Sequence, residues 1–393
     1  MGTLRQIVEI SAINLRSVRA RLGAALVVCS GIAGVVAVLV TVLAMAAGLR
    51  TAYASAARDD RAIVLSLGSH AEAASALSRE DVAAIESGPG LLSIQDGARA
   101  VSAELLLPVG VPRKGEPGDG TVTVRGLTPI AVAVRPEIRL VAGRMFGSGV
   151  REVIVGNSAH DQFDRLDIGD TVRFYNGDWR VVGLFASRGD AHESELLADA
   201  DTLMSAARRT GFNAATVVLA EPAAFTAFAQ TLLRDPRLKV EVLPEAEYYG
   251  RRSEQAGALV EIVATTVAAI MAVGALLGAL NVMYTTVGSR HVEIATMRAI
   301  GFGATPVVVS VLIEALAFAV VGAAIGATVA WSFFDGGAFT TGGLFGQVAG
   351  HLRIGASQIA EGAAWAVVIG LLGGLFPAIH AARRSVSDAL RAV

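Results

Sequence analysis

Hydrophobic residues in this chain gather in four long segments. Three of them contain no Asp, Glu, Lys or Arg, at residues 22–49, 262–289 and 362–379, and the segment at residues 299–334 carries only Glu314. A helix of about 20 apolar residues spans the hydrocarbon core of a membrane. The pattern therefore predicts four transmembrane helices.

A charged stretch at residues 50–254 separates the first two apolar segments, and its short patterns are typical of a mixed α/β domain. Asn176-Gly177 between two alternating runs indicates a hairpin, because this pair tolerates the positive φ of a tight turn. Ser78 and Asp81 have the spacing of a capping box that opens a helix. The Pro- and Gly-rich residues 108–120 are expected to form a surface loop. The strands are expected at 62–67, 121–125, 151–155, 171–175, 179–185 and 216–220, and the helices at 79–86 and 222–233.

These patterns together predict an α-helical membrane protein with four transmembrane helices and a mixed α/β extracytoplasmic domain. The expected parts are an amphipathic helix (1–21), transmembrane helix 1 (22–49), the α/β domain (50–254), transmembrane helix 2 (255–289), a helix or loop (290–303), transmembrane helix 3 (304–334), a loop (335–360), transmembrane helix 4 (361–380) and a tail (381–393).

Arginine residues orient these helices, because basic residues collect on the cytoplasmic side of a membrane. They cluster before the first apolar segment, between the second and third, and after the fourth, whereas the loop at 335–360 has only Arg353. Both termini and residues 290–303 are therefore expected in the cytoplasm. The clustered residues are Arg5, Arg16, Arg19, Arg21, Arg290, Arg298, Arg383, Arg384 and Arg391.

The segment before the first transmembrane helix has apolar residues at helical spacing, which predicts an amphipathic helix lying on the membrane. A cytoplasmic extension of transmembrane helix 1 is an equal alternative. A cleaved signal peptide is disfavoured, because the apolar run exceeds the 7–15 residues such peptides use. The apolar residues of this stripe are Leu4, Ile7, Val8, Leu15, Val18 and Leu22.

Composition supports a membrane protein, since 53% of the residues are hydrophobic and only 17% are charged. The single cysteine, Cys29, lies within transmembrane helix 1, so the α/β domain has no disulfide. The only lysines are Lys114 and Lys239. Because a phosphate loop needs a lysine beside its glycines, the chain is not expected to bind ATP in that way.

Two clusters in the α/β domain combine a histidine with carboxylates, which are the residue types of metal and acid–base sites. They are His160 with Asp161 and Asp164, and His192 with Glu193 and Glu195. We interpret both as solvated surface, since such neighbours are common in acidic domains. The sequence predicts no catalytic residue, cofactor or metal on this chain.

Inside the membrane, three pairs of glycines have the G-x-x-x-G spacing that lets helix backbones approach closely. They predict helix packing at Gly274/Gly278, Gly322/Gly326 and Gly370/Gly374. Glu314 is a suspected functional residue, because carboxylates within the membrane are costly. A proton relay and a hydrogen bond between helices both stay open for it.

The polar insert between transmembrane helices 2 and 3 resembles a known family. Its residues match, in order and spacing, the R-x-x-E-I-x-x-x-R-A-x-G segment of MacB/FtsX-like permease subunits of ABC transporters: Arg290, Glu293, Ile294, Arg298, Ala299 and Gly301. The resemblance implies that this segment couples the permease to an ATPase. We expect Ile294, Met297 and, one turn on, Ile300 or Gly301 to form an apolar ridge for the partner, with Glu293 and Arg298 beside it.

The order of the segments also resembles these permeases, most closely the stand-alone subtype of lipoprotein-releasing permeases. The resemblance implies mechanotransmission, in which a separate ATPase binds ATP and Mg and its motion is relayed to the extracytoplasmic domain. The substrate would be a lipid, lipoprotein, peptide or drug-like molecule. The implied partners are a cytoplasmic ATPase dimer, a second or homologous permease, membrane lipids, and a periplasmic adaptor or outer-membrane protein, with no nucleic acid. The implied location is the bacterial inner membrane.

Two other classes of function stay open. One is a signalling or scaffold subunit that uses ATPase-driven motion to control an extracytoplasmic partner, such as a cell-wall hydrolase. The other is a membrane enzyme that uses the carboxylates of the α/β domain, although the sequence has no catalytic motif for it.

Overall fold

The computed structural model describes residues 3–17, 21–94, 97–115, 117–300, 302–341 and 348–383, and it divides into two compact units. We call them the helical unit and the sheet domain. The helical unit comprises residues 1–47, 258–337 and 352–393, and the sheet domain comprises residues 48–257 and 338–351.

Four helices in the described chain are long and apolar enough to cross a membrane, as the sequence predicts. They are α2 (Leu22–Ala56), α8 (Glu245–Ser289), α10 (Ala304–Phe334) and α11 (Ala356–Arg383). Two shorter helices accompany them, α1 (Thr3–Ser17) before α2 and α9 (His291–Ala299) between α8 and α10. With the mixed sheet described below, they confirm the predicted fold class.

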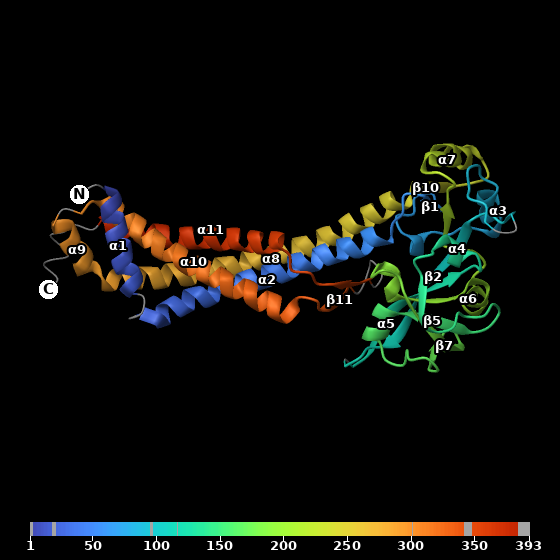
Figure 1. The fold of residues 1–393 in the computed structure, drawn as a ribbon, viewed down its shortest axis with the longest axis horizontal. Coiled ribbons are helices and arrows are strands. Elements are labelled where there is room, and N and C mark those ends of the chain that lie inside the picture. The colour runs from blue at the N-terminus through green and yellow to red at the C-terminus, as the bar shows by residue number, and fades with distance from the viewer. Residues whose placement is uncertain are drawn as a thin grey trace. The chain divides into compact units, whose positions relative to one another are not determined.

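Two of the membrane helices extend further than their apolar segments. Helix α2 continues past residue 49 to Ala56, and α8 begins at Glu245 rather than at residue 255. Residues 48–56 and 245–257 of these helices belong to the sheet domain. Both are drawn as unbroken ribbons in Figure 1, so each helix connects the two units without a loop.

Helix α1 packs on α10 in the helical unit. Ile10 is buried, and Asn14 Nδ2 donates a hydrogen bond to Ser310 Oγ at 3.2 Å. Of the predicted apolar stripe, Val8 is exposed, which suits a face turned to lipid. Leu4, Leu15 and Val18 lie outside the side chains or residues that the structure describes.

The sheet domain is built on one ten-stranded mixed sheet in the order β10-β1-β9-β2-β3-β8-β5-β7-β4, with β6 paired to β7. The β3–β8 and β5–β7 pairs are parallel, and the others are antiparallel. The strands are β1 (Arg61–Ser66), β2 (Val101–Pro112), β3 (Asp119–Leu127), β4 (Arg139–Gly143), β5 (Glu152–Gly156), β6 (Thr171–Phe174), β7 (Gly177–Ala186), β8 (Glu195–Asp199), β9 (Ala214–Val218) and β10 (Val240–Pro244).

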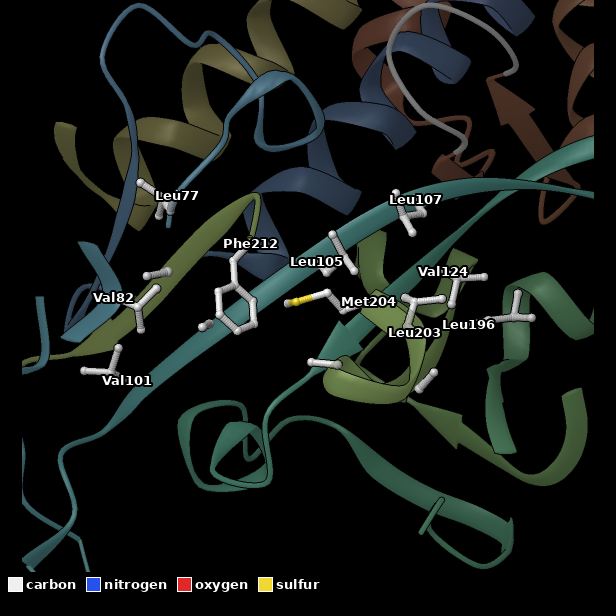
Figure 2. Packing of buried hydrophobic residues seen from close by; sticks show 14 of the residues in the cluster. Leu77, Val82, Val101, Leu105, Leu107, Val124, Leu196, Leu203, Met204 and Phe212 are labelled. Carbon is white, nitrogen blue, oxygen red and sulfur yellow. The ribbon is translucent and has the colours of Figure 1, made fainter. Parts of the chain in front are cut away.

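Short helices complete this domain. They are η2 (Glu72–Ala74), α3 (Arg79–Glu86), α4 (Ala131–Val134), α5 (Asn157–Gln162), η4 (Ala191–Ser194), α6 (Ala200–Ala206), η5 (Pro222–Ala224) and α7 (Phe225–Arg234). The main apolar core includes residues from β2, β3 and α6. In Figure 2, Leu105 and Phe212 lie beside Met204 in this core.

Local signals in the sequence are confirmed where one turn or one cap decides the structure. Helix α3 begins with the predicted capping box, in which the Ser78 side chain accepts from Asp81 N and the Asp81 side chain accepts from Ser78 N. The predicted β6–β7 hairpin forms, but its turn lies one residue earlier than the expected Asn176-Gly177 pair, at Tyr175 and Asn176, which are both at positive φ. Behind the turn, Trp179 stacks on Phe174 with 4.8 Å between ring centroids.

The expected loop at residues 108–120 is wrong. Most of it forms a hairpin, because β2 runs to Pro112 and β3 begins at Asp119. Pro108 is tolerated because this part of β2 pairs with β3, while β9 pairs only with residues 101–104. The loop expected at 335–360 also contains structure, a hairpin of β11 (Ala338–Thr341) and β12 (Val348–His351).

Candidate functional site

The predicted coupling segment forms helix α9, which a single residue separates from α8. That residue, Arg290, departs from helical geometry at φ −109° and ψ 13°. Its backbone N donates to Val287 O at 3.2 Å, and Ile294 N donates to Arg290 O at 3.0 Å. Arg290 is therefore the elbow between a membrane helix and a short polar helix.

Two residues of the apolar ridge expected on α9 do not face outward, so the expectation is wrong for Ile294 and Met297. Ile294 is buried, and Met297 packs against the core of the helical unit. Ile300, which follows the last residue of α9, is the described ridge residue that does face outward; it is 71% exposed, and Glu293 and Thr296 are exposed on the same side. Ile294 and Met297 point inward because they pack against α10 within the helical unit.

The charged residues of the segment are divided between the two faces. The Arg290 side chain is only 6% exposed, while its ion-pair partner Glu293 is 62% exposed, with Nε 2.9 Å from Oε2. Arg298 is half-buried, and Gly301 lies outside the described residues. Whether the segment couples to an ATPase stays a prediction.

Two of the three predicted glycine pairs lie at helix contacts within this chain. A Cβ at Gly326 would lie 2.5 Å from Ala33 O on α2, and one at Gly322 would lie 3.0 Å from Cys29 O. On α11, a Cβ at Gly370 or Gly374 would lie 2.6 Å from the Cβ of Ala319 or Ala315. These glycines thus permit close approach of α10 to α2 and to α11.

The third pair differs, because among the described residues nothing lies within 4 Å of a Cβ at Gly274 or Gly278. Their helix α8 is also the least buried of the four long helices within the described chain. Glu314, by contrast, is buried on α10 and lines a small cavity.

A buried network of charges in the sheet domain was not predicted from the sequence. It contains three arginines that are at most 2% exposed and five glutamates, together with His192. Its members are Arg61, Arg125, Arg135, Glu72, Glu104, Glu137, Glu195, Glu245 and His192. We call this set the charge network.

The centre of the charge network crosses the sheet. Arg125 on β3 donates to both carboxylate oxygens of Glu195 on β8, at 2.6 and 2.8 Å, and also to Glu104 on β2. Arg135 donates to Glu104 Oε1 at 3.1 Å and to Thr216 Oγ1 at 3.0 Å. Such paired hydrogen bonds offset the cost of burying the charges.

The edge of the charge network reaches the ends of α2 and α8. Glu245 is the first residue of α8, and its Oε2 accepts from Arg61 Nε at 2.6 Å and from the backbone N of Arg58 at 3.0 Å. Arg61 Nη2 donates to the carbonyl of Ala56, the last residue of α2, at 3.0 Å. One ion pair therefore fastens the ends of both helices to β1.

The interpretation of His192, Glu193 and Glu195 as solvated surface is wrong, because all three are buried. Arg135 Nη1 lies 3.1 Å from His192 Nε2, and His192 Nδ1 lies 3.3 Å from Glu195 Oε2. Since a guanidinium only donates, Nε2 must accept, which assigns a neutral imidazole with its proton on Nδ1. The sequence held no local signal for this burial, since the partners come from distant strands.

The electrostatics of the charge network favour ionised carboxylates at its centre. Burial opposes ionisation of Glu104, but the Arg135 and Arg125 guanidinium groups outweigh it and lower the pKa to about 2. Burial likewise opposes ionisation of Glu195, and Arg125 lowers the pKa of this carboxyl below its ordinary range. For Asp190 nearby, burial prevails and raises the pKa.

Among the described residues, no group of three or more His, Cys, Asp or Glu side chains could hold a metal ion. The other histidine cluster lies near the surface, where His160 Nε2 is 2.8 Å from Asp167 Oδ1. Asp161 is 3.8 Å from His160 and 73% exposed, as expected for solvated groups.

Comparison with known families gives two matches that together cover most of the chain. Residues 24–234, more than half of the chain, match the MacB-like periplasmic core domain, and residues 265–386 match the FtsX-like permease C-terminal domain. A comparison with curated protein sequences gives no match.

Two solved structures resemble the sheet domain. The periplasmic region of MacB from Actinobacillus actinomycetemcomitans is 14% identical, with a TM-score of 0.37, over 48% of this chain and 90% of that one. The extracellular domain of the noncanonic ABC-type transporter YknZ from Gram-positive bacteria is 15% identical, with a TM-score of 0.36, over 47% of this chain and 99% of that one.

Proposed function

The chain belongs to the MacB/FtsX-like family of ABC transporter permeases, and we propose that it relays the ATP-driven motion of a separate cytoplasmic ATPase to its sheet domain. The family is the permease component of ABC transporters and implies an ABC ATPase as partner. Membership of this family and the four apolar helices make this an inner-membrane protein. The proposal adds the mechanism, mechanotransmission, and the orientation, with both termini and α9 in the cytoplasm.

The observation that carries the proposal is the attachment of α2 and α8 to the sheet domain. Each helix passes from the helical unit into the sheet domain without a break. Their ends are tied together by the Arg61–Glu245 pair, in which both side chains are at most 1% exposed. A displacement of the helices would therefore be passed to β1 as a rigid-body movement rather than absorbed by a loop.

The cytoplasmic end of the relay is the exposed face of α9. Glu293, Thr296 and Ile300 present an acidic, a polar and an apolar side chain to a partner. A short helix that offers such a face to a groove is a common mode of recognition, and the charge sets its orientation. Ile294 and Met297 would act by holding α9 against the helical unit.

A complete transporter would hold two permeases and two ATPase subunits, with ATP and Mg bound by the ATPases. Gly274 and Gly278 on α8 supply a close-contact motif that this chain does not use among its described residues. The substrate class we propose is a lipid, lipoprotein, peptide or drug-like molecule handled by the sheet domain.

Co-purification with the ATPase tests this proposal. The change Ile300→Asp places a charge on the exposed face of α9 without touching the buried core. We expect the full-length variant to insert in the membrane and to retain little of the ATPase that copurifies with the parent chain. Leu67→Asp, which alters an equally exposed residue of the sheet domain, serves as the matched control and should retain the ATPase.

Equal ATPase recovery with both variants would refute α9 as the docking site. If the ATPase copurifies but no candidate substrate stimulates its activity in liposomes, the signalling subunit becomes the better account of the complex.

A further inference from the structure

A small polar cavity in the helical unit lies between α1, α8, α9 and α10. Its volume is about 10 Å³, and its polar lining comes from Asn14, Thr286, Arg290, Ser310 and Glu314. A site for one buried water needs about 10–15 Å³ and two to four polar partners. The cavity therefore has the size and the lining of a single-water site.

Glu314 supplies the acceptor in this cavity. Its side chain is 4% exposed, and among the described residues no hydrogen bond to its carboxylate is formed. A buried carboxyl group without a hydrogen-bond partner is costly, and a donor within the cavity would supply that partner.

Arg290 supplies the donors. Its side chain is 6% exposed, and Nε is occupied by Glu293 at 2.9 Å. Among the described residues, Glu293 is the group that accepts a hydrogen bond from the Arg290 side chain, through Nε, which leaves the two Nη groups as possible donors. Both Arg290 and Glu314 line the same cavity, so guanidinium donors and a carboxyl acceptor border the same small space.

We propose that one water molecule binds in this cavity, accepts a hydrogen bond from the Arg290 guanidinium and donates one to the Glu314 carboxylate. The bridge joins α10 to the elbow between α8 and α9. Glu314 is thereby a positioning residue that acts through Arg290 on helix α9. Its consequence for ATPase coupling rests on the proposed function, whereas the bridge itself does not.

Hydrogen exchange of the full-length chain in lipid nanodiscs tests the bridge without any ATPase. Glu314→Leu keeps a side chain of similar size but removes the acceptor. We expect the amides of residues 291–299 to exchange at least about tenfold faster, because losing a hydrogen bond to a charged group has an effect of this order. Glu314→Gln keeps an oxygen that accepts from the water and should stay within about threefold of the parent chain.

The matched control is Glu361→Leu, which removes an exposed carboxylate outside the cavity and should leave α9 unchanged. Exchange of α9 that is unchanged or slower in Glu314→Leu would overturn the bridge, because an apolar side chain would then serve as well. Equal acceleration in Glu314→Gln and Glu314→Leu would overturn the water-mediated form. Failure of Ile300→Asp to release the ATPase would alter none of these exchange results.

Discussion

Removing the carboxylate of Glu104 should be among the most destabilising single changes in the sheet domain. Glu104 is fully buried on β2, where it accepts hydrogen bonds from Arg125 and Arg135. The change Glu104→Gln keeps the shape of the side chain but leaves two buried guanidinium groups short of one negative charge. Breaking a buried ion pair in this way costs about 3–5 kcal/mol.

The electrostatics of the site give a magnitude of the same order. The pKa of Glu104 falls from its ordinary value of 4.5 to about 2. This difference corresponds to roughly 3 kcal/mol, at about 1.4 kcal/mol for each tenfold change in proton affinity. We therefore expect Glu104→Gln to lower the free energy of unfolding of the sheet domain by about 3 kcal/mol.

The sign of the pH dependence follows from the lowered pKa. The stability contributed by ionised Glu104 is fully present above its unfolded pKa of 4.5 and is lost as the pH falls toward about 2. The difference between the parent chain and Glu104→Gln should therefore shrink over this window. Above pH 5 it should be constant, apart from other titrating groups.

Denaturant unfolding of the full-length chain in nanodiscs, followed by the fluorescence of Trp179, measures this effect. Trp179 is fully buried in the sheet domain, and Trp331 and Trp365 are replaced by phenylalanine in all variants. Glu80→Gln, at an exposed position of α3, is the control and should change stability by less than about 0.5 kcal/mol. A loss below about 1 kcal/mol in Glu104→Gln would refute the reasoning about the charge network.

Two further predictions concern the membrane part. A cysteine at Leu67 should react with an impermeant thiol reagent in intact cells and one at Ser289 should not, because the arginine clusters predict that α9 lies in the cytoplasm. Labelling at Ser289 alone would reverse the predicted orientation. Gly326→Val should abolish the folded chain in detergent, whereas Gly274→Val should leave it intact, because a Cβ meets Ala33 O at 2.5 Å only at the first position. Equal yields of the two in size-exclusion chromatography would contradict the helix contacts.

The sequence predicted those features of the fold that depend on neighbouring residues. The capping box at Ser78, the turn at Asn176 and the four apolar helices each follow from a pattern within one segment. The hairpin at residues 101–127 was missed, because Pro108 signals a loop unless the pairing of β2 is known. Glycine and proline indicate the local conformational preference of the backbone, but they do not show whether a partner strand is present.

The candidate sites were less predictable, because they depend on contacts between distant residues. Arg61 and Glu245 are 184 positions apart, so no local pattern could reveal their pairing. The sequence alone indicates surface residues at His192 and Glu195, and only the fold shows that Arg135 contacts His192 and that Arg125 pairs with Glu195. Helical periodicity predicted that α9 has an apolar side that includes Ile294, but it could not predict that this side faces α10.

The central claim is that ATP-driven motion reaches the sheet domain through α9, α8 and α2. Its most direct test is the distance between spin labels on Leu67→Cys in the two permease copies, in a Cys29→Ala background, within nanodiscs that also hold the ATPase. Trapping ATP should shift the distance distribution in the parent complex. In Glu245→Leu, which removes the tie between the helix ends, the distribution should stay unshifted while ATP hydrolysis continues. An unshifted distribution in the parent complex, or an equal shift in Glu245→Leu, would contradict it.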